Sequence, residues 1–300
     1  MISTIILTYN EELHIERCIR NAQKFSKEIF VVDSFSTDRT VEIAEYLGAK
    51  VSQNKWENNY ARQFNWALDS LPVKTEWVFR LDADEYLTDA LIEEIKEKLP
   101  TLDKNISGVA VNLGYIFLGK WIKRGIYPLK LLRLFKYEKA RCEERWMDEH
   151  IELLSGQTVE FKNSMFDHNL NNLGWFTQKH NAYSIREAID LLDIKLGIQN
   201  RNSNAKLSPE AQKKRKKKLK YAMMPLFLRA FLFFAYRYIY KLGFIEGKEA
   251  FIRHFLQGLW YRILVDAKIF EIQLACGNDR EKIIDYIRAN YGIDCSNPKS

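Results

Sequence analysis

Residues 77–85 are Trp-Val-Phe-Arg-Leu-Asp-Ala-Asp-Glu, a mainly apolar run that passes directly into acidic side chains. A short apolar run of this kind predicts a buried strand, here over Trp77–Leu81. The acidic residues Asp82, Asp84 and Glu85 then follow the point where that strand ends. This stretch therefore predicts a core strand that delivers carboxylates to one edge of a sheet.

The first 100 residues alternate further strand patterns with helical ones. Two more apolar runs predict buried strands, Ser3–Thr8 and Glu28–Asp33. Helical spacing and helix-end residues predict four helices: Glu12–Lys24, Thr40–Leu47, Asn59–Leu71 and a segment from Thr88 to about Leu99. Near-continuous apolar strands separated by helices are typical of a parallel sheet covered on both faces, so we expect an α/β fold.

Polar residues follow three of these strands. The first strand runs into Thr8-Tyr9-Asn10-Glu11, the second ends at Asp33, and the third leads into Asp82 and Asp84. In open parallel α/β sheets, ligands bind beyond the carboxyl ends of the strands. We therefore expect these clusters to converge on one edge of the sheet and to form a binding site there.

Asp82 and Asp84 are spaced so that both carboxylates can leave the strand end toward one ion. Oxygen ligands suit Mg²⁺ or Mn²⁺, which take one or two carboxylates together with substrate phosphates. The alternative is a helix start, where acidic residues are favoured by the dipole and by capping. Asp33 likewise suits either a strand-end turn or a contact with the N–H of a nucleotide base.

Four motifs together resemble the family-2 glycosyltransferases of the GT-A fold. They are Thr8-Tyr9-Asn10-Glu11, 32–38 (Val-Asp-Ser-Phe-Ser-Thr-Asp), 61–67 (Ala-Arg-Gln-Phe-Asn-Trp-Ala) and 81–85 (Leu-Asp-Ala-Asp-Glu). The rest of the chain more loosely resembles the bacterial branch that adds hexoses to lipopolysaccharide inner core. That looser match lies in Arg133-Leu134-Phe135, Asp148-Glu149-His150 and 267–271 (Ala-Lys-Ile-Phe-Glu).

The resemblance implies a mainly parallel, Rossmann-like sheet and a role for each matched residue. The residues implied to bind the nucleotide sugar are Thr8, Tyr9, Asn10, Glu11, Asp33, Arg62, Asp82 and Ala83. Within this set, Asp33 would hold uracil or another base, Arg62 would contact the diphosphate, and Asp82 would face the ribose or the metal's water shell. Asp84 would ligate Mn²⁺ or Mg²⁺, with Asp82 and a late histidine, His168, completing the metal site. A structural role is the alternative for His168.

The family also implies inversion at the anomeric carbon, which requires a base that deprotonates the acceptor hydroxyl. The acidic pair Asp148-Glu149 is the candidate segment, and Glu149 is favoured within it. Many family-2 enzymes have Glu-Asp at this point and the core-sugar branch often has His-Glu, whereas this chain has Asp-Glu-His. The alternative is an acidic surface turn.

Composition and pattern divide the chain into two expected domains. Residues 1–205 would form the catalytic domain, with the nucleotide-sugar half at 1–100 and the acceptor half at 101–205. Residues 206–300 would form a basic, amphipathic helical module, because ten Lys or Arg and no acidic residue lie between Ala211 and Lys241, although the whole chain carries only +7.

The apolar segment Met223–Tyr240 is 18 residues long and is interrupted by two arginines. A spanning helix needs about 20 apolar residues, and each central Arg costs about 2.5–3.5 kcal/mol on insertion. We therefore expect a helix that lies in the membrane interface, with basic side chains at anionic headgroups. The expected headgroup contacts are Lys213, Lys214, Arg215, Lys216, Lys217, Lys218, Lys220, Arg229 and Arg237. A solvated basic surface is the alternative, and no base-reading motif supports nucleic-acid binding.

These features predict an enzyme at the cytoplasmic face of the inner membrane that glycosylates a lipid-linked saccharide or lipopolysaccharide core. The residues at the start, Met1–Leu7, lack the basic region of a signal peptide. Four scattered cysteines without a CxxC pair fit a reducing compartment.

Two other functions compete with this interpretation. A sugar-phosphate nucleotidyltransferase would carry a Gly-rich basic loop after the first strand, where this chain has Thr8-Tyr9-Asn10-Glu11. A non-catalytic scaffold docked on the membrane would have lost the acidic motif, but both Asp82 and Asp84 are present.

Overall fold

The computed structural model describes residues 1–57, 59–143, 149–197 and 209–295, with the backbone alone for 209–215. The chain forms two compact units. Unit 1 contains Met1–Glu143 and Glu149–Leu170, and unit 2 contains the described residues from 171 onward. Each unit has its own hydrophobic core.

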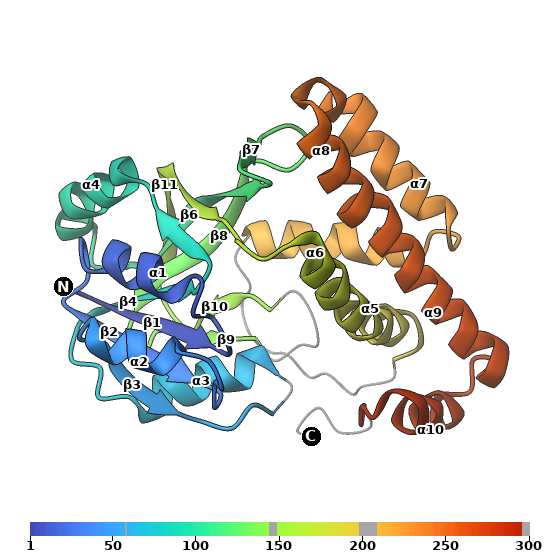
Figure 1. Ribbon diagram of the computed structural model, residues 1–300, viewed down its shortest axis with the longest axis horizontal. Coiled ribbons are helices and arrows are strands. Elements are labelled where there is room, and N and C mark those ends of the chain that lie inside the picture. Colours follow the sequence, from blue (N-terminus) through green and yellow to red (C-terminus); the bar gives the residue numbers. More distant parts are fainter. Residues whose placement is uncertain (58, 144–148, 198–208, 296–300) are drawn as a thin grey trace. The chain divides into compact units, whose positions relative to one another are not determined.

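Unit 1 is built on a mixed sheet (Figure 1), in which nine described strands are hydrogen-bonded. From one edge to the other, the strands are β3 (Lys50–Gln53), β2 (Glu28–Asp33), β1 (Ile2–Thr8), β4 (Trp77–Asp82), β8 (Leu129–Lys136), β6 (Ile106–Phe117), β11 (Gln157–Asp167) and β5 (Glu85–Leu87), with β7 (Lys120–Ile122) paired to β6. The first four run parallel. Strand β8 is antiparallel to both of its neighbours, and β5 is antiparallel to β11.

Helices cover both faces of the parallel half, as the apolar strand runs predict. The helices of unit 1 are α1 (Ile15–Ala22), α2 (Thr40–Tyr46), α3 (Tyr60–Ser70), α4 (Asp89–Lys98) and the 3-10 turn η1 (Leu99–Thr101). Alternate residues of each strand enter different cores: Ile6 packs with α1, α2 and α4, whereas Ile5 packs with α3. A short hairpin, β9 (Ala140–Cys142) with β10 (Ile151–Leu153), adds to the α3 side.

Capping residues set the helix ends at the positions expected from the sequence. The Thr88 hydroxyl accepts a hydrogen bond from the Leu91 N–H, and the Asn59 side chain accepts one from the Arg62 N–H. Gly48 follows α2 with φ 81°, a left-handed conformation that glycine adopts without a Cβ clash. The α/β prediction is therefore confirmed, and the sheet is mixed, because β5, β7 and β8 run antiparallel to their neighbours.

Unit 2 is helical. Its described elements are α5 (Leu173–Leu196), α6 (Pro209–Ala222), α7 (Leu228–Ala235), the π-helical η2 (Tyr236–Tyr240), the 3-10 turn η3 (Gly243–Glu246), α8 (Lys248–Arg253), the π-helical η4 (His254–Trp260), α9 (Tyr261–Cys276) and α10 (Arg280–Tyr291). Helix α5 buries Ile189 and Leu192 in one core with Ile269 and Ile283. The structural boundary thus falls after Leu170, and not at residue 205 as the polar composition of 197–209 suggested.

The apolar segment Met223–Tyr240 is not one continuous helix. Helix α6 ends at Ala222 and α7 begins only at Leu228. Pro225 lacks an N–H, and Phe227 has φ 64°, so the chain turns between the two helices. No helix in the described residues is long and apolar enough to cross a membrane.

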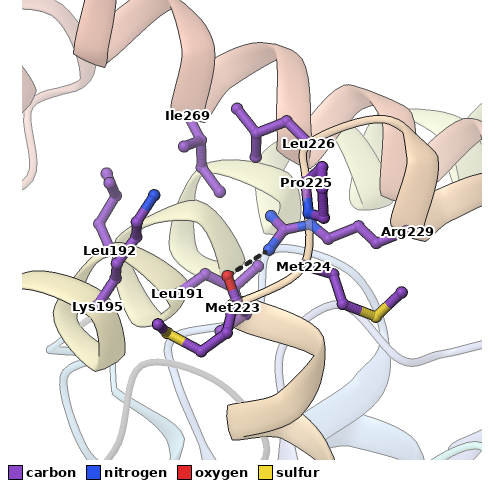
Figure 2. Close-up of a pocket in the computed structure, with 10 residues that line it drawn as sticks. Leu191, Leu192, Lys195, Met223, Met224, Pro225, Leu226, Arg229 and Ile269 are labelled. Atoms are coloured by element: carbon purple, nitrogen blue, oxygen red, sulfur yellow. Dashed lines mark hydrogen bonds between the residues drawn. The ribbon is translucent and has the colours of Figure 1, made fainter.

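Arg229 does not reach outward, which corrects the expectation that it contacts headgroups. It is 1% exposed, and its Nε and Nη2 donate to Asp266 Oδ1 at 2.8 and 2.5 Å. Its Nη1 donates to the Ala222 carbonyl at 3.2 Å, in the wall of a pocket of about 180 Å³ (Figure 2). The desolvation of this charge is offset by the pair, so Arg229 holds α7 on α9.

The basic run is only partly available as a surface. Lys218 lies 2.8 Å from buried Asp190 and 3.3 Å from Glu187, so it forms ion pairs within unit 2. Lys216, Lys217 and Lys220 are exposed, and Arg237 is half-buried over the Phe233 ring. The side chains of Lys213, Lys214 and Arg215 lie outside the described residues.

Candidate functional site

The three polar strand ends meet in the structure. Strand β1 lies between β2 and β4, so Thr8 is the register partner of Asp33 and Leu7 that of Asp82. The carboxyl ends of parallel strands share one sheet edge, and the residues after them therefore face the same space.

Asp33 organises the loops that follow β1 and β2. It is fully buried, and it accepts hydrogen bonds from the Thr8 hydroxyl at 3.0 Å and from the Ser36 N–H at 2.8 Å. Asn10, at φ 55°, donates its N–H to Ser36 Oγ and accepts the Thr37 N–H, both at 2.8 Å. These bonds hold the two loops together, and the Tyr9 residue beside them is 59% exposed.

Glu11 continues this organisation at the start of α1. Its N–H donates to Thr40 Oγ1 at 2.7 Å, and its carboxylate lies 2.6 Å from His14 Nδ1. Thr8, Asn10, Glu11 and Asp33 thus form one hydrogen-bonded rim on the β1–β2 side of the strand ends.

Asp82 sits among groups that stabilise its charge. Tyr60 donates its hydroxyl to Asp82 Oδ1, and Arg133 Nη2 donates to Oδ2 at 3.2 Å. Arg80 Nε donates to the Tyr60 hydroxyl at 3.1 Å and lies 4.0 Å from Asp82. Burial opposes ionisation, but Arg133, Arg80 and Tyr60 outweigh it and lower the pKa of Asp82 to about 2. Asp82 is therefore a carboxylate at neutral pH.

Glu85 fixes the turn that carries the acidic motif. It is 2% exposed, accepts the Asp82 N–H at 2.9 Å, and pairs with Arg133 at 2.5 Å. Burial raises the pKa of Glu85 well above its usual range, against the lowering effect of Arg133. Its role is to hold Asp82 and Asp84 at the strand end.

Strand pairing brings His168 to Asp84. Strand β11 pairs with β5 so that Asp167 faces Glu85, and the His168 N–H then donates to the Asp84 carbonyl at 2.9 Å. Arg17, from α1, ties both backbones together through its Nη2, at 3.1 Å from the Asp84 carbonyl and 2.6 Å from that of His168. Residues that are 84 positions apart in the sequence are thus joined by backbone bonds.

The chemistry of these donors fits a divalent metal through Asp84 better than through His168. Asp84 is half-exposed, and its Oδ2 accepts one hydrogen bond, from Asn169 at 3.0 Å. Both Asp82 oxygens are already engaged. Within the described residues, no group of three His, Cys, Asp or Glu side chains is placed to hold a metal ion. A site with one carboxylate then takes its other oxygens from substrate phosphates and water.

His168 is held neutral and oriented by Arg17. Its Nδ1 lies 3.1 Å from Arg17 Nη1. Burial, then the charge of Arg17, lowers the pKa of His168. Arg17 can only donate, so Nδ1 accepts and the proton of the neutral ring sits on Nε2. In this arrangement His168 offers a hydrogen-bond donor, and metal ligation requires Arg17 to release Nδ1.

Two further expected residues, Arg62 and Glu149, lie within the described part of unit 1. Arg62 is in the first turn of α3, two residues after Tyr60, and its Nη1 lies 3.7 Å from Glu57. Glu149 is half-buried just before β10, whereas Asp148 lies outside the described residues. Burial, and with it the charge of Glu149, raises the pKa of Cys142 to about 12, against the lowering effect of Arg80. Glu149 therefore shares the environment of Cys142, whose sulfur lies 3.9 Å from Arg80.

Sequence reasoning did not assign roles to Tyr60, Arg17, Arg80 and Asn169. A signal existed for Arg80, because a charge inside a buried strand needs a partner. Arg133 appeared only as part of a loose motif, although it bonds both Asp82 and Glu85. Tyr60 and Arg17 carry no local signal, since their partners are distant in the sequence.

Together the mixed α/β sheet and the carboxylates at its strand ends define a Rossmann-like enzyme of the GT-A type. The chain belongs to glycosyl transferase family 2, whose family model matches residues 3–152. The protein is therefore a glycosyltransferase, and the family resemblance of its motifs is confirmed.

Several known glycosyltransferases are similar to this chain. An uncharacterised glycosyltransferase of Rickettsia typhi is 30% identical over 92% of this chain and 89% of its own length. The lipopolysaccharide core biosynthesis glycosyltransferase LpsC of Rhizobium meliloti is 30% identical over 47% of this chain and 53% of its own. A solved mannosyltransferase from Pyrobaculum calidifontis, in complex with GDP-Man and Mn²⁺, is 18% identical, with 90% of this chain and 86% of that one covered and a TM-score of 0.48.

Proposed function

We propose that this glycosyltransferase moves a hexose from a UDP-sugar, with inversion, to a lipid-linked saccharide or lipopolysaccharide-core acceptor. The proposed donor site rests on the strand-end cluster, in which an ionised Asp82 and a half-buried Asp84 lie beside the Thr8–Asp33 rim. This arrangement lies inside the part of the chain that matches the family.

Each residue of the cluster has a proposed task toward the donor. Asp33 and the rim take the base, Asp82 faces the ribose, and Arg62 contacts the diphosphate. Asp84 holds a divalent metal, which when bound neutralises the charge that develops on the leaving diphosphate. His168 donates its Nε2–H toward the same phosphates, or takes a metal-ligand role if Arg17 moves away.

Glu149 is the proposed base, with Asp148 as the alternative in the same acidic segment. It takes the proton of the acceptor hydroxyl while that oxygen bonds to the anomeric carbon. The bond from that carbon to the diphosphate oxygen breaks on the opposite face, and the nucleoside diphosphate leaves. This geometry gives inversion.

The acceptor class and the cytoplasmic face of the inner membrane are proposed from two observations. A relative in Rhizobium meliloti is named for lipopolysaccharide core biosynthesis. Unit 2 carries exposed basic residues, Lys216, Lys217 and Lys220, that suit anionic headgroups.

A donor-hydrolysis screen tests the proposal. Purified full-length protein is incubated with a panel of nucleotide sugars in Mn²⁺, Mg²⁺ or EDTA, and the release of nucleoside diphosphate is measured. We expect release from one donor that EDTA abolishes and that Asp84→Ala lowers by about 10²-fold or more, the cost of losing one electrostatic stabiliser in a site.

The matched control is Asp89→Ala, which removes an exposed carboxylate of the same unit that pairs with Lys24 at 2.9 Å. Release that persists in EDTA, or that falls equally in both variants, would contradict the proposal.

A further inference from the structure

The segment formed by α7 and η2 carries large apolar and aromatic side chains on its outer side as well as on its inner side, and Arg229 and Arg237 are its charged residues. Its inner side packs into unit 2, where Arg229 and Ala230 are buried. Its outer side is uncovered within unit 2: the exposed large side chains are Leu228, Phe231, Leu232, Tyr236, Ile239 and Tyr240. Helix faces that are apolar are normally enclosed by other elements or by a membrane, so we expect another surface to cover this outer side.

The exposed surface continues beyond η2. Its further members, on η3, α8 and their flanks, are Leu242, Phe244, Ile245, Phe251 and Phe255, each at least 40% exposed. We call the two sets together the apolar belt. Single exposed apolar residues are common, but a contiguous run of this density marks an interaction surface.

Aromatic packing keeps the belt in a fixed form. Tyr236 stacks on Tyr240 with 5.5 Å between ring centroids, and Phe251 stacks on Phe255 at 5.9 Å. Tyr238, between these pairs in the chain, contacts Phe251 and Phe244 at 5.7 and 6.3 Å. The belt is therefore a preformed surface of rings, and its exposure does not arise from a loose tail.

The charges beside the belt are mainly positive. No acidic residue lies between Ala211 and Lys241, and Lys241 Nζ lies 5.6 Å from both the Tyr236 and the Tyr240 rings. Glu246 and Glu249 are the acidic residues of the η3–α8 part, next to Lys248. Tyrosines and lysines at the margin of an apolar surface suit the boundary between headgroups and acyl chains, where each keeps its polar tip in water.

We propose that the apolar belt inserts into the interfacial layer of an anionic lipid bilayer. The proposal rests on the membrane location proposed above and names the surface that makes the contact. The principal membrane contact is then made by exposed rings. Arg229 and Lys218 do not make it, because they are engaged inside unit 2. The exposed lysines of α6 then add attraction to anionic headgroups.

A bilayer fits this surface better than a second copy of the chain. A two-fold dimer through the belt would oppose the same patch on both partners. Its lysines would then face one another with few acidic partners, and such like-charge contacts are unfavourable. An anionic bilayer instead supplies both the apolar cover and the opposite charge.

Vesicle flotation of the full-length protein tests the proposal. The probes are vesicles of phosphatidylcholine alone and of phosphatidylcholine with about one third phosphatidylglycerol, since anionic lipid attracts basic residues. We expect flotation with the anionic vesicles. We expect Phe231→Asp, and separately the double variant Phe244→Ser with Ile245→Ser, to weaken partitioning by about tenfold or more, the scale of one or two lost apolar side chains.

The matched control is Leu274→Ser, which removes a 77% exposed leucine of α9 outside the belt. It should float like the wild type. Circular dichroism establishes that each variant is folded, and hydrolysis of the soluble donor by the same samples reports the catalytic site separately.

Three results would overturn the proposal: wild-type protein that stays with the soluble fraction, belt variants that float like the wild type, or a dimer in sedimentation velocity that Phe231→Asp dissociates. Donor hydrolysis that is absent while flotation is normal would count against the proposed reaction and leave the belt intact.

Discussion

Each unit of this protein buries an arginine beside a carboxylate. The two clusters differ in burial and in how many of their donors are hydrogen-bonded. In unit 2, Arg229 and Asp266 are 1% and 0% exposed, and Asp266 also accepts the Phe227 N–H at 2.7 Å. In unit 1, Arg133 is 4% exposed and bonds Glu85 and Asp82, while its Nε and Nη1 find no partner among the described residues.

We interpret this difference as the one between a structural cluster and the cluster that we propose binds the donor. A closed pair satisfies its donors and acceptors and joins two helices. The unit 1 cluster leaves donors of Arg133 unsatisfied, keeps the carboxylates of Asp82 and Asp84 only partly buried, and gathers them with Glu85 at one turn. Such a cost in stability is expected at sites that bind or react.

The largest effect should come from Arg133→Met. This change leaves buried Glu85 without its cation and also removes a partner of Asp82. We expect unit 1 to lose about 3–5 kcal/mol of unfolding free energy, measured by denaturant unfolding with hydrogen exchange to localise the loss. Retained stability would show that the ion pair is dispensable and would contradict the comparison of the Arg133 and Arg229 clusters.

Arg229→Met should cost unit 2 a similar or slightly smaller amount, because only Asp266 is left unpaired. The double variant Arg229→Met with Asp266→Leu should recover most of it, since a buried ion pair is often replaceable by apolar side chains. The corresponding Arg133→Met with Glu85→Leu should recover stability but not donor hydrolysis. Recovery of both in unit 1 would mean that its cluster is structural as well.

Acidification should lower the unfolding free energy of unit 2 through His180, by a smaller amount than the arginine variants. Burial lowers its pKa to about 4, against the raising effect of its bond to the Phe176 carbonyl. Between the unfolded pKa of 6.5 and the folded pKa of about 4, the unfolded chain binds a proton that the folded chain does not. The contribution of His180 to stability is therefore complete above pH 6.5. It falls as the pH drops and levels off below about pH 4.

The pH-dependent loss should amount to about 1–3 kcal/mol. His180→Phe should flatten the stability profile of unit 2 over this range, in unfolding curves measured at several pH values. A variant with the slope of the wild type would assign the acid sensitivity to other groups.

The smallest change in stability should come from Asp84→Asn. Its side chain is half-exposed, and Oδ2 accepts one hydrogen bond, from Asn169. We expect the unfolding free energy to stay within about 0.5 kcal/mol of the wild type, although the donor reaction is impaired. A large loss of stability would place Asp84 with Glu85 as a structural residue.

Sequence patterns predicted the parts of this molecule that depend on local periodicity. The buried strands, the cap at Thr88 and the convergence of Asp33 and Asp82 all follow from short-range patterns and from the rule for strand ends. The family motifs added the GT-A class.

Long-range pairing explains what the sequence did not predict. An arginine in an apolar run can reach the headgroups or pair inside the protein, and the outcome for Arg229 depends on Asp266, 37 positions later. The boundary after Leu170 depends likewise on which core accepts α5. The family resemblance implied that His168 lies near Asp84, but the backbone hydrogen bond between them depends on the register of β11 on β5.

Calorimetric titration of the full-length protein with UDP, with and without Mn²⁺, tests whether the strand-end carboxylates form a metal–nucleotide site. We expect that Mn²⁺ tightens UDP binding to the wild type, that Asp84→Asn loses this metal-dependent gain, and that Asp89→Ala keeps it. UDP binding that is indifferent to Mn²⁺, or a gain that survives Asp84→Asn, would contradict the assignment of the strand-end carboxylates to a metal–nucleotide site.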